Sequence, residues 1–428
     1  MTFVAPATSL RGAVAVPGDK SISHRAVLLG AIGEGETVVR GFGRAADTES
    51  TVAAVRALGV DVCEEGPDVL RIGGVGLRGL KAPEGSIDCG NAGTLVRLIA
   101  GVLAGQAWQQ FELIGDESLS SRPMARIADP LTAMGAGVET EDGRLPLGIE
   151  GRPLHGIDYE LPVASAQVKS CVLLAGLYAD GETRVHEPVP TRDHTERMLR
   201  AAGAHVRTGP GRVSVRAAER LTLGEIDVPG DISSAAPLVL AATLLQGSEL
   251  IVTGVGVNPT RTGFLDVLER MGARISYFNR RTAGGEPVAD LEVTHAELVA
   301  TEIEPGEVPS MVDELPLFVL AASMAHGVSS VRGAGELRTK ETDRIVAVAG
   351  GLRALGAHVT ATPDGFRVRG VPSRLRGGRM SSAGDHRIAM LGAIAGLASR
   401  EGVDVQDAEA VAVSFPGFFD LLDSLAQR

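Results

Sequence analysis

The sequence predicts an α/β fold of two similar halves, each containing three copies of one unit with buried helices. The main observation is a pattern that recurs six times, in which a cluster of Gly, Pro, Ser, Asp or Asn runs into an apolar stretch of helical length. The clusters lie at residues 18–21, 90–94, 164–167, 230–233, 309–313 and 384–387. Their spacing of about seventy residues exceeds the roughly 20–50 residues of stacked solenoid repeats, so each copy is a larger α/β unit.

A second observation places the division between the halves. Val-Pro-Gly-Asp opens the first copy at Val16 and recurs at Val228 to open the fourth. We therefore expect one domain at 18–229 and a discontinuous domain formed by 1–17 plus 230–428, with a chain crossing at each of these two sites. The β-like stretch at 10–16 has no helix of its own, and we expect it in the sheet of the last copy.

The elements of a copy follow from its pattern of apolar residues. In the third copy we expect a helix at 168–178, a strand at 182–187, a helix at 195–202 and a hairpin with strands at 205–207 and 212–215. The first helices are apolar on most faces, which is typical of helices buried in a domain centre. Polar starts on buried helices direct the helix N-termini to a common surface, where anions are favoured.

The composition limits the class of partner. The net charge of −12 argues against a nucleic acid or an anionic membrane, because both require a basic face, but it allows a small anion in a locally basic cleft. No apolar run reaches the roughly 18 residues of a membrane span, and the N-terminus lacks the pattern of a signal peptide. The three cysteines have no metal-binding spacing. We expect a soluble, cytoplasmic protein without a metal.

The most specific cluster is the stretch 17–25, Pro-Gly-Asp-Lys-Ser-Ile-Ser-His-Arg. It places Lys20 and Arg25, together with the hydroxyl of Ser21, in the first turns of a helix. Cations are unfavourable at a helix N-terminus, where the dipole is already positive, so their presence there predicts a bound anion. The alternative is a solvated helix cap.

Other helix starts carry similar groups, each of which could alone be a surface ion pair. Lys340 and Arg344 are four residues apart and are expected to share a helical face beside Glu341. The recurrence of such groups at one position of the repeat favours a shared site over separate surface ion pairs. The further candidates are Arg122, Ser165, Gln167, Arg192 and Arg387.

Two acids, Asp313 and Glu314, are expected to begin a helix that runs to Met324. Acids in a first helical turn ordinarily complement the helix dipole, and that is one interpretation of Glu314. Carboxylates inside a site rich in Lys and Arg can instead transfer protons.

These stretches together resemble the 5-enolpyruvylshikimate-3-phosphate synthase family, the 3-phosphoshikimate 1-carboxyvinyltransferases. The motifs are PGDKSISHRA, GNAGT, SAQVKS, TRDHTE, KETDR and DHRIAM, in order over nearly the whole chain. The resemblance implies two similar domains, each of three βαβαββ repeats, closing on an interdomain cleft. It also implies transfer of the enolpyruvyl group of phosphoenolpyruvate to the 5-hydroxyl of shikimate 3-phosphate, with release of phosphate, in aromatic amino-acid biosynthesis. We expect a monomer that needs no cofactor.

The resemblance further implies a role for each site residue. Shikimate 3-phosphate would be held by Lys20, Ser21, Arg25, Ser165, Ala166, Gln167, Arg192, Asp313 and Lys340. Phosphoenolpyruvate would be held by Lys20, Gly93, Arg122, Arg344 and Arg387. Arginine suits this role because its planar guanidinium pairs bidentately with carboxylate and phosphate. Asp313 would accept the proton of the attacking hydroxyl and Glu341 would exchange a proton at the methylene carbon, with Lys20 as the third catalytic residue.

The sequence departs from the family pattern at two positions. Ala166 stands where many members have Ser, and Val413 stands where many have Lys before Thr-Phe-Pro. Both changes resemble members with reduced sensitivity to glyphosate, whereas the best-known tolerant member has Ala where this chain keeps Gly93, so we expect intermediate sensitivity.

Two other functions compete with this one. A UDP-N-acetylglucosamine enolpyruvyl transferase would carry a reactive Cys in its Gly-rich loop, and the comparable stretch 115–126 contains none. A non-catalytic repeat scaffold that binds an anionic metabolite would have no need of Asp313 and Glu341 beside its anion sites.

Overall fold

Contacts within the chain divide the computed structural model, which describes residues 1–428, into two units. Unit 1 comprises Met1–Pro17, Pro229–Thr282 and Pro287–Arg428, and unit 2 comprises Gly18–Val228 and Ala283–Glu286. The chain thus passes between the units at four places rather than at two, because the short segment 283–286 groups with unit 2.

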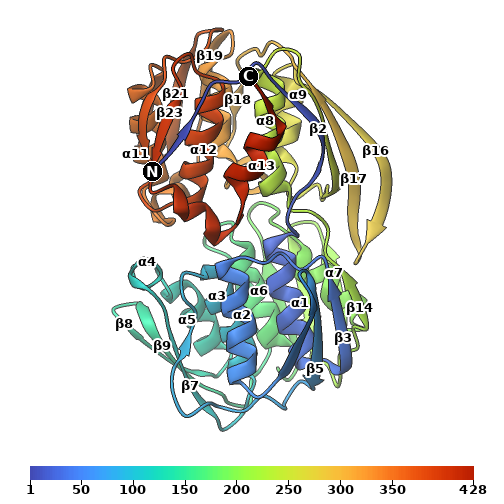
Figure 1. Ribbon diagram of the computed structural model, residues 1–428. Helices are drawn as coiled ribbons and strands as arrows, with labels where there is room; N and C mark the ends of the chain where they lie inside the picture. The colour runs from blue at the N-terminus through green and yellow to red at the C-terminus, as the bar shows by residue number, and fades with distance from the viewer. The chain divides into compact units, whose positions relative to one another are not determined.

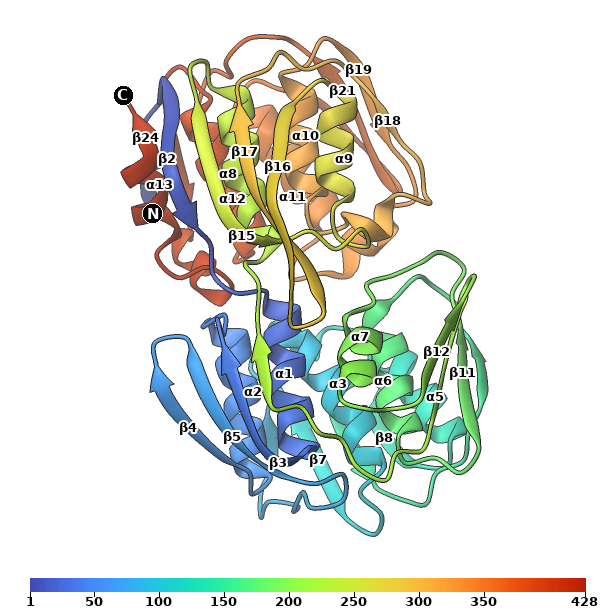
Figure 2. The same ribbon diagram turned by 90° about the vertical axis from the view of Figure 1, so that its right-hand side faces the viewer.

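Unit 2 has its central helices flanked by sheets. Figure 2 shows α1, α3 and α6 in its interior, with β3, β4 and β5 on one side and β11 and β12 on the other. The helices are α1 (Lys20–Ile32), α2 (Ala46–Ala57), α3 (Gly93–Ala104), α4 (Glu117–Ser120), α5 (Ala125–Ala133), α6 (Ala166–Gly176) and α7 (His194–Ala201). The strands are β3 (Glu34–Arg40), β4 (Asp61–Gly66), β5 (Val69–Val75), β6 (Ile87–Asp88), β7 (Gln110–Ile114), β8 (Gly137–Glu141), β9 (Arg144–Glu150), β10 (Asp158–Glu160), β11 (Glu182–His186), β12 (Val206–Gly209), β13 (Arg212–Arg216) and β14 (Glu225–Asp227).

The three sheets of unit 2 share one topology. Their strand orders are β14-β3-β5-β4, β6-β7-β9-β8 and β10-β11-β13-β12. In each sheet the first two strands are parallel and the remaining pairs are antiparallel. Parallel neighbours require a crossover, and α3 and α6 supply it in the second and third sheets. The second and third copies are therefore βαβαββ units, whereas the first copy takes its outer strand, β14, from the far end of the segment.

Unit 1 has the same kind of interior helices. Figure 1 shows α8 and α12 within it and the long β16–β17 hairpin at its side. The helices are α8 (Ile232–Leu244), α9 (Gly263–Arg270), α10 (Leu315–Ser323), α11 (Arg344–Ala354), α12 (His386–Leu397) and α13 (Phe418–Leu425), with 3₁₀ turns η1 (Val308–Ser310), η2 (Gly335–Thr339) and η3 (Ala408–Val413). The strands are β1 (Thr2–Val4), β2 (Ser9–Ala15), β15 (Glu249–Gly256), β16 (Arg274–Ala283), β17 (Glu286–Thr294), β18 (Glu302–Ile303), β19 (Gly327–Val331), β20 (His358–Thr362), β21 (Gly365–Gly370), β22 (Gly378–Ser381), β23 (Val403–Gln406) and β24 (Ala426–Gln427).

The sheets of unit 1 correct one expectation about the N-terminus. Their strand orders are β16-β17-β15-β2-β24, β18-β19-β21-β20 and β1-β23-β22. β2 pairs in parallel with β15 of the fourth copy, so its assignment to the sheet of the last copy is wrong; β1 joins that sheet instead. Alternation along a strand predicts which face is buried, but it does not indicate which sheet edge the strand joins.

The first helices of the copies are buried, as predicted. Every residue of α12 is buried, and so is every residue of α3 except Thr94. A Cβ atom on Gly101 of α3 would lie 2.2 Å from the carbonyl oxygen of Cys171 in α6, so these helices pack at a distance that only glycine allows. The predicted α/β class is thereby confirmed. No helix has the length and apolar character that crossing a membrane requires.

Candidate active site

The start of α1 holds Lys20 in a defined position. Asp19 caps the helix by accepting a hydrogen bond from Ile22 N at 2.9 Å. Lys20 Nζ lies 2.7 Å from Asp47 Oδ2 in α2, and the Asp47 side chain is largely buried. An ammonium group fixed beside a helix N-terminus is suited to an anionic ligand. The sequence does not predict Asp47 as a partner of Lys20, because no spacing rule connects residues on different helices.

Arg25 is buried and donates three hydrogen bonds. Its Nε donates to Thr195 Oγ1 at 2.7 Å, its Nη2 to Ser170 Oγ at 2.9 Å and its Nη1 to Ser21 O at 2.8 Å. Burial lowers the pKa of Arg25 to about 10, while nearby carboxylates oppose that shift. The guanidinium therefore stays protonated at neutral pH and is held in one orientation by α6 and α7.

Lys169, which the sequence does not indicate as a site residue, links the same two helices, α6 and α7. Its side chain in α6 is fully buried, and Nζ lies 2.7 Å from Glu196 Oε1 in α7 and 3.0 Å from Glu187 Oε2. A buried ammonium needs such partners, because an unpaired charge in the interior is costly. This buried ion group fixes the relative position of the helices that hold Arg25.

The starts of α3 and α6 are linked by an arginine. Arg97 Nη1 donates to Gln167 Oε1 at 2.8 Å and to Gly93 O at 3.1 Å, and Gln167 Nε2 donates to Thr94 Oγ1 at 2.9 Å. Two predicted site residues, Gly93 and Gln167, are thus brought together by Arg97, which the sequence analysis did not single out.

Ser165 and Ala166 occupy the start of α6. Ser165 is the N-cap and accepts a hydrogen bond from Val168 N at 3.4 Å. Ala166 is the first helical residue, and its methyl group offers no hydrogen bond. Arg192 lies two residues before α7. Burial is the main cause of the lowered pKa of Arg25, and the positive charge of Arg192 lowers that pKa further. Arg25 and Arg192 therefore contribute positive charge to the same region of unit 2.

Arg122 lies beside Gly93. Its Nη2 donates to Asn91 Oδ1 at 2.6 Å and to Ser118 Oγ at 3.2 Å. A Cβ atom at Gly93 would lie 2.9 Å from Nη1 of both Arg122 and Arg97. The absence of a side chain at Gly93 leaves room for two guanidinium groups, which favours an anion-binding site there.

In unit 1 the candidate acids surround Arg344, whose side chain is 2% exposed. Nε lies 2.7 Å from Asp385 Oδ2, Nη2 lies 2.7 Å from Glu341 Oε2 and Nη1 lies 3.4 Å from Asp313 Oδ1. Although burial acts against it, the three carboxylates raise the pKa of Arg344 above its ordinary value. Lys340 Nζ lies 3.8 Å from Asp313 Oδ1. The structure thus brings four predicted site residues of unit 1 together.

The fifth predicted residue of unit 1, Arg387, begins α12 beside Asp385. Its backbone N donates to Asp385 Oδ1 at 2.8 Å, and its Nη1 donates to Ser233 O at 3.1 Å and lies 3.8 Å from Glu314 Oε1. Glu314 is fully buried and accepts a hydrogen bond from the Ser233 hydroxyl. Glu314 is the N-cap residue of α10, so it lies where an acid complements the helix dipole, and it is buried there.

Two expected helix boundaries are wrong. α10 begins at Leu315, so Asp313 and Glu314 precede it. α11 begins at Arg344, because Asp343 caps it by accepting a hydrogen bond from Val346 N at 3.1 Å. Lys340 lies before this cap and shares no helical face with Arg344; the two cations are neighbours because both approach Asp313.

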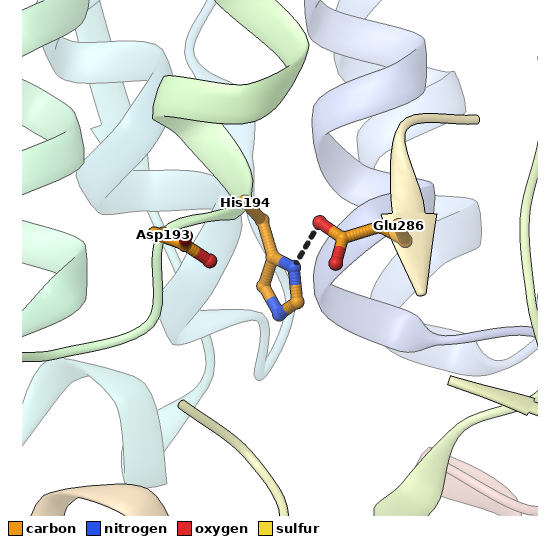
Figure 3. Close-up of side chains that lie close together, drawn as sticks. All are labelled: Asp193, His194 and Glu286. Atoms are coloured by element: carbon orange, nitrogen blue, oxygen red, sulfur yellow. Dashed lines mark hydrogen bonds and ion pairs between the residues drawn. The ribbon is translucent and has the colours of Figure 1, made fainter. Parts of the chain in front are cut away.

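A further charged group in unit 2 contains Asp193, His194 and Glu286, whose potential ligand atoms lie within 4.8 Å of one another (Figure 3). His194 Nδ1 is 2.8 Å from Glu286 Oε1. Arg197 Nε lies 2.9 Å from both oxygens of Asp193 and 3.9 Å from Glu286 Oε2. A guanidinium thus already supplies the positive charge of this group, which reduces its suitability for a metal ion.

Comparison with known proteins places the chain among relatives of similar length. The model of the family described as EPSP synthase (3-phosphoshikimate 1-carboxyvinyltransferase) matches residues 4–422. A 3-phosphoshikimate 1-carboxyvinyltransferase of Acidithiobacillus ferrooxidans is 55% identical over 418 residues, which are 97% of this chain and 95% of that protein. One from a Geobacter species is 52% identical over 427 residues, 99% of each chain. The solved EPSP synthase of Acinetobacter baumannii is 43% identical, with a TM-score of 0.88 over 99% of this chain and 97% of that chain.

The repeated fold, the arginine-rich helix starts and the carboxylates around Arg344 define an enzyme that acts on small anions. More narrowly, the chain belongs to the EPSP synthase family, the 3-phosphoshikimate 1-carboxyvinyltransferases, which are enolpyruvyl transferases.

Proposed function

We propose that the protein transfers the enolpyruvyl group of phosphoenolpyruvate to the 5-hydroxyl of shikimate 3-phosphate, giving 5-enolpyruvylshikimate 3-phosphate and phosphate for aromatic amino-acid biosynthesis. The observation that supports this most is the group around Arg344, in which one buried guanidinium lies within 3.4 Å of both Asp313 and Glu341. A cation that binds an anionic substrate beside two acids provides what an addition–elimination reaction on phosphoenolpyruvate requires.

The residues of unit 2 bind shikimate 3-phosphate in this proposal. The supporting feature is a set of fixed cations and hydroxyls at helix starts, where dipole and side chains together favour an anion. The residues are Lys20, Ser21, Arg25, Ser165, Ala166, Gln167 and Arg192. The proposal also assigns Asp313 and Lys340 to shikimate 3-phosphate, since the base has to reach its 5-hydroxyl.

Phosphoenolpyruvate is held by arginines whose positions are set by neighbouring side chains. Arg122 is oriented by Asn91, and Arg344 by Asp385. Guanidinium groups pair with the carboxylate and phosphate of this substrate in a planar, bidentate manner. Lys20, Gly93 and Arg387 complete the set.

The proton steps fall to the two acids. Glu341, as the acid, protonates the methylene carbon of phosphoenolpyruvate, which makes the neighbouring carbon electrophilic. Asp313 takes the proton from the 5-hydroxyl as its oxygen attacks that carbon. Removal of a methyl proton by Glu341 and departure of phosphate then regenerate the double bond. The ammonium of Lys20 stabilises the charge on the phosphate that leaves.

Phosphate release tests this function directly. With phosphoenolpyruvate present, the purified enzyme should release phosphate when shikimate 3-phosphate is added, and it should release none when UDP-N-acetylglucosamine is added instead. Release with the sugar nucleotide would identify the related enolpyruvyl transferase, and release with neither acceptor would favour a binding protein.

We further propose that the enzyme is a cytoplasmic monomer that acts without nucleic acid, metal or cofactor. The net charge of −12 supports the expectation about nucleic acid, because backbone phosphates need a basic face. Light scattering of the purified protein tests the monomer, and activity in the presence of a chelator tests independence from metals.

A further inference from the structure

Glu286 is a buried carboxylate at the tip of the β16–β17 hairpin, and the proposed reaction leaves it without a role. Glu286 as a whole is 1% exposed, and it belongs to the segment Ala283–Glu286, which groups with unit 2. A carboxylate is seldom buried to this extent unless hydrogen bonds or ion pairs compensate for its lost hydration.

The hairpin tip is held in place by backbone contacts. Gly284 and Gly285 have φ of +56° and +81°, values that glycine adopts without strain and that suit a tight hairpin turn. A Cβ atom on Gly284 would lie 2.5 Å from Asp227 O, so the turn packs directly on the β14 backbone. On the other side, Arg197 Nη1 donates to Gly285 O at 3.4 Å.

Glu286 contacts the first turn of α7 through His194. Figure 3 shows the imidazole lying between Asp193 and Glu286, with Nδ1 facing the Glu286 carboxylate, and the Nδ1–Oε1 distance is 2.8 Å. His194 is 1% exposed, and its Nε2 has no hydrogen-bond partner. Glu286 is therefore a principal polar anchor of the residue that begins this helix.

The first turn of α7 in turn holds Arg25. Thr195, the residue after His194, accepts the Nε hydrogen bond of Arg25 at 2.7 Å and lies 2.7 Å from Ser170 Oγ. The Glu286 charge also acts on Arg25 directly, since it is among the carboxylates that oppose the burial-induced lowering of the pKa of Arg25. Arg192, two residues before His194, is carried on the same segment.

We infer that Glu286 is a positioning residue for shikimate 3-phosphate: through His194 it fixes the start of α7, and thereby the placement of Arg25 and Arg192. The inference rests on the proposed role of these two arginines in binding that substrate. Glu286 itself has no role in the chemistry.

Calorimetric titration of the full-length enzyme with shikimate 3-phosphate alone tests the inference. Glu286→Ala should raise the dissociation constant by about 5- to 50-fold, as expected for residues coupled in one network. Glu286→Gln should raise it less, because the amide oxygen can still accept from Nδ1 of His194. The matched control is Glu292→Gln, an exposed position on the same strand, which should leave the constant unchanged.

A selective change in kinetics separates positioning from a general loss of structure. The Michaelis constant for shikimate 3-phosphate should rise in the Glu286 variants, while the constant for phosphoenolpyruvate and kcat stay near those of the parent enzyme. Equal changes in both Michaelis constants, or unchanged binding in both variants, would overturn the inference. Glu286→Gln retains side-chain volume and decides the question if Glu286→Ala does not fold. Failure of the parent enzyme to bind shikimate 3-phosphate would instead overturn the proposed site itself.

Discussion

Arg344 and Asp385 form an ion pair inside unit 1, with Nε 2.7 Å from Oδ2 and neither side chain more than 2% exposed. The same guanidinium reaches Glu341 at 2.7 Å and Asp313 at 3.4 Å. Asp385 therefore orients the arginine, and the arginine orients both candidate proton-transfer groups.

Removing this arginine should cost both stability and activity. Arg344→Gln leaves the buried Asp385 carboxylate without its cation, so the free energy of unfolding should fall by about 3–5 kcal/mol. Urea denaturation measures the change. Arg379→Gln is the control, because its pair with Asp404 spans 3.8 Å with Arg379 largely exposed, and such pairs contribute about 0–1 kcal/mol. Similar losses of unfolding free energy in both variants would mean that the buried Arg344–Asp385 pair contributes no more to stability than an exposed ion pair.

Gly93→Ala tests the proposed phosphoenolpyruvate pocket. The added methyl would lie 2.9 Å from Nη1 of Arg122 and of Arg97, so both guanidinium groups would have to move. Glyphosate, which the family resemblance implies competes with phosphoenolpyruvate, is the longer ligand and should be crowded more. The ratio of its inhibition constant to the Michaelis constant of phosphoenolpyruvate should rise about 10- to 200-fold. An unchanged ratio would show that Gly93 does not line the pocket. The parent enzyme itself should show intermediate sensitivity to glyphosate.

His24 should make stability depend on pH. Burial, and to a smaller extent Lys20 and Arg25, lower its pKa well below 6.5. The folded state therefore keeps His24 neutral, while the unfolded chain takes up a proton below pH 6.5. Its contribution to stability is complete above that pH and is lost as pH falls toward the folded-state pKa, by up to about 1.4 kcal/mol per pH unit.

Unfolding measured at pH 7.5 and 5.5 checks this effect. Between the two pH values the free energy of unfolding should change less in His24→Gln than in the parent enzyme. In His358→Gln, where the histidine is exposed, it should change as much as in the parent enzyme. The same difference in all three proteins would show that other groups cause the pH dependence.

The local elements of the fold could be predicted from the sequence. The helix expected at 195–202 is α7, His194–Ala201, and the expected hairpin at 205–215 is β12 and β13. The periodicity of apolar residues and turn residues such as Gly-Pro-Gly depend on neighbours along the chain, which is why these elements are predictable.

Partners that are distant in sequence could not be predicted in the same way. Glu286 contacts His194 from 92 residues away, and Lys169 is buried on a helix whose pattern reads as apolar. The expected helical pairing of Lys340 with Arg344 failed for a related reason: the Asp343 cap begins the helix after Lys340, and Asp313 unites the two cations instead. Candidate residues were identified by type, but their pairing is set by tertiary packing.

Glu341→Gln should block proton exchange at the methylene carbon. The side chain keeps its size and can still accept from Arg344 Nη2, but its amide has no acidic proton to transfer to carbon. In D₂O the parent enzyme should incorporate deuterium into the enolpyruvyl methylene of the product. The variant should turn over about 10²–10⁴-fold more slowly. Parent-like rates and deuterium content would assign this step to another group.

Asp313→Asn tests the central claim, that Asp313 is the base that accepts the proton of the 5-hydroxyl of shikimate 3-phosphate. The amide keeps the size of the side chain but cannot accept the hydroxyl proton. The decisive measurement is kcat for phosphate release, set beside the calorimetric dissociation constant for shikimate 3-phosphate, in this variant and in the parent enzyme. We predict a kcat lower by about 10²–10⁴-fold with the dissociation constant largely kept. Turnover close to that of the parent enzyme would contradict the assignment of Asp313 as the base.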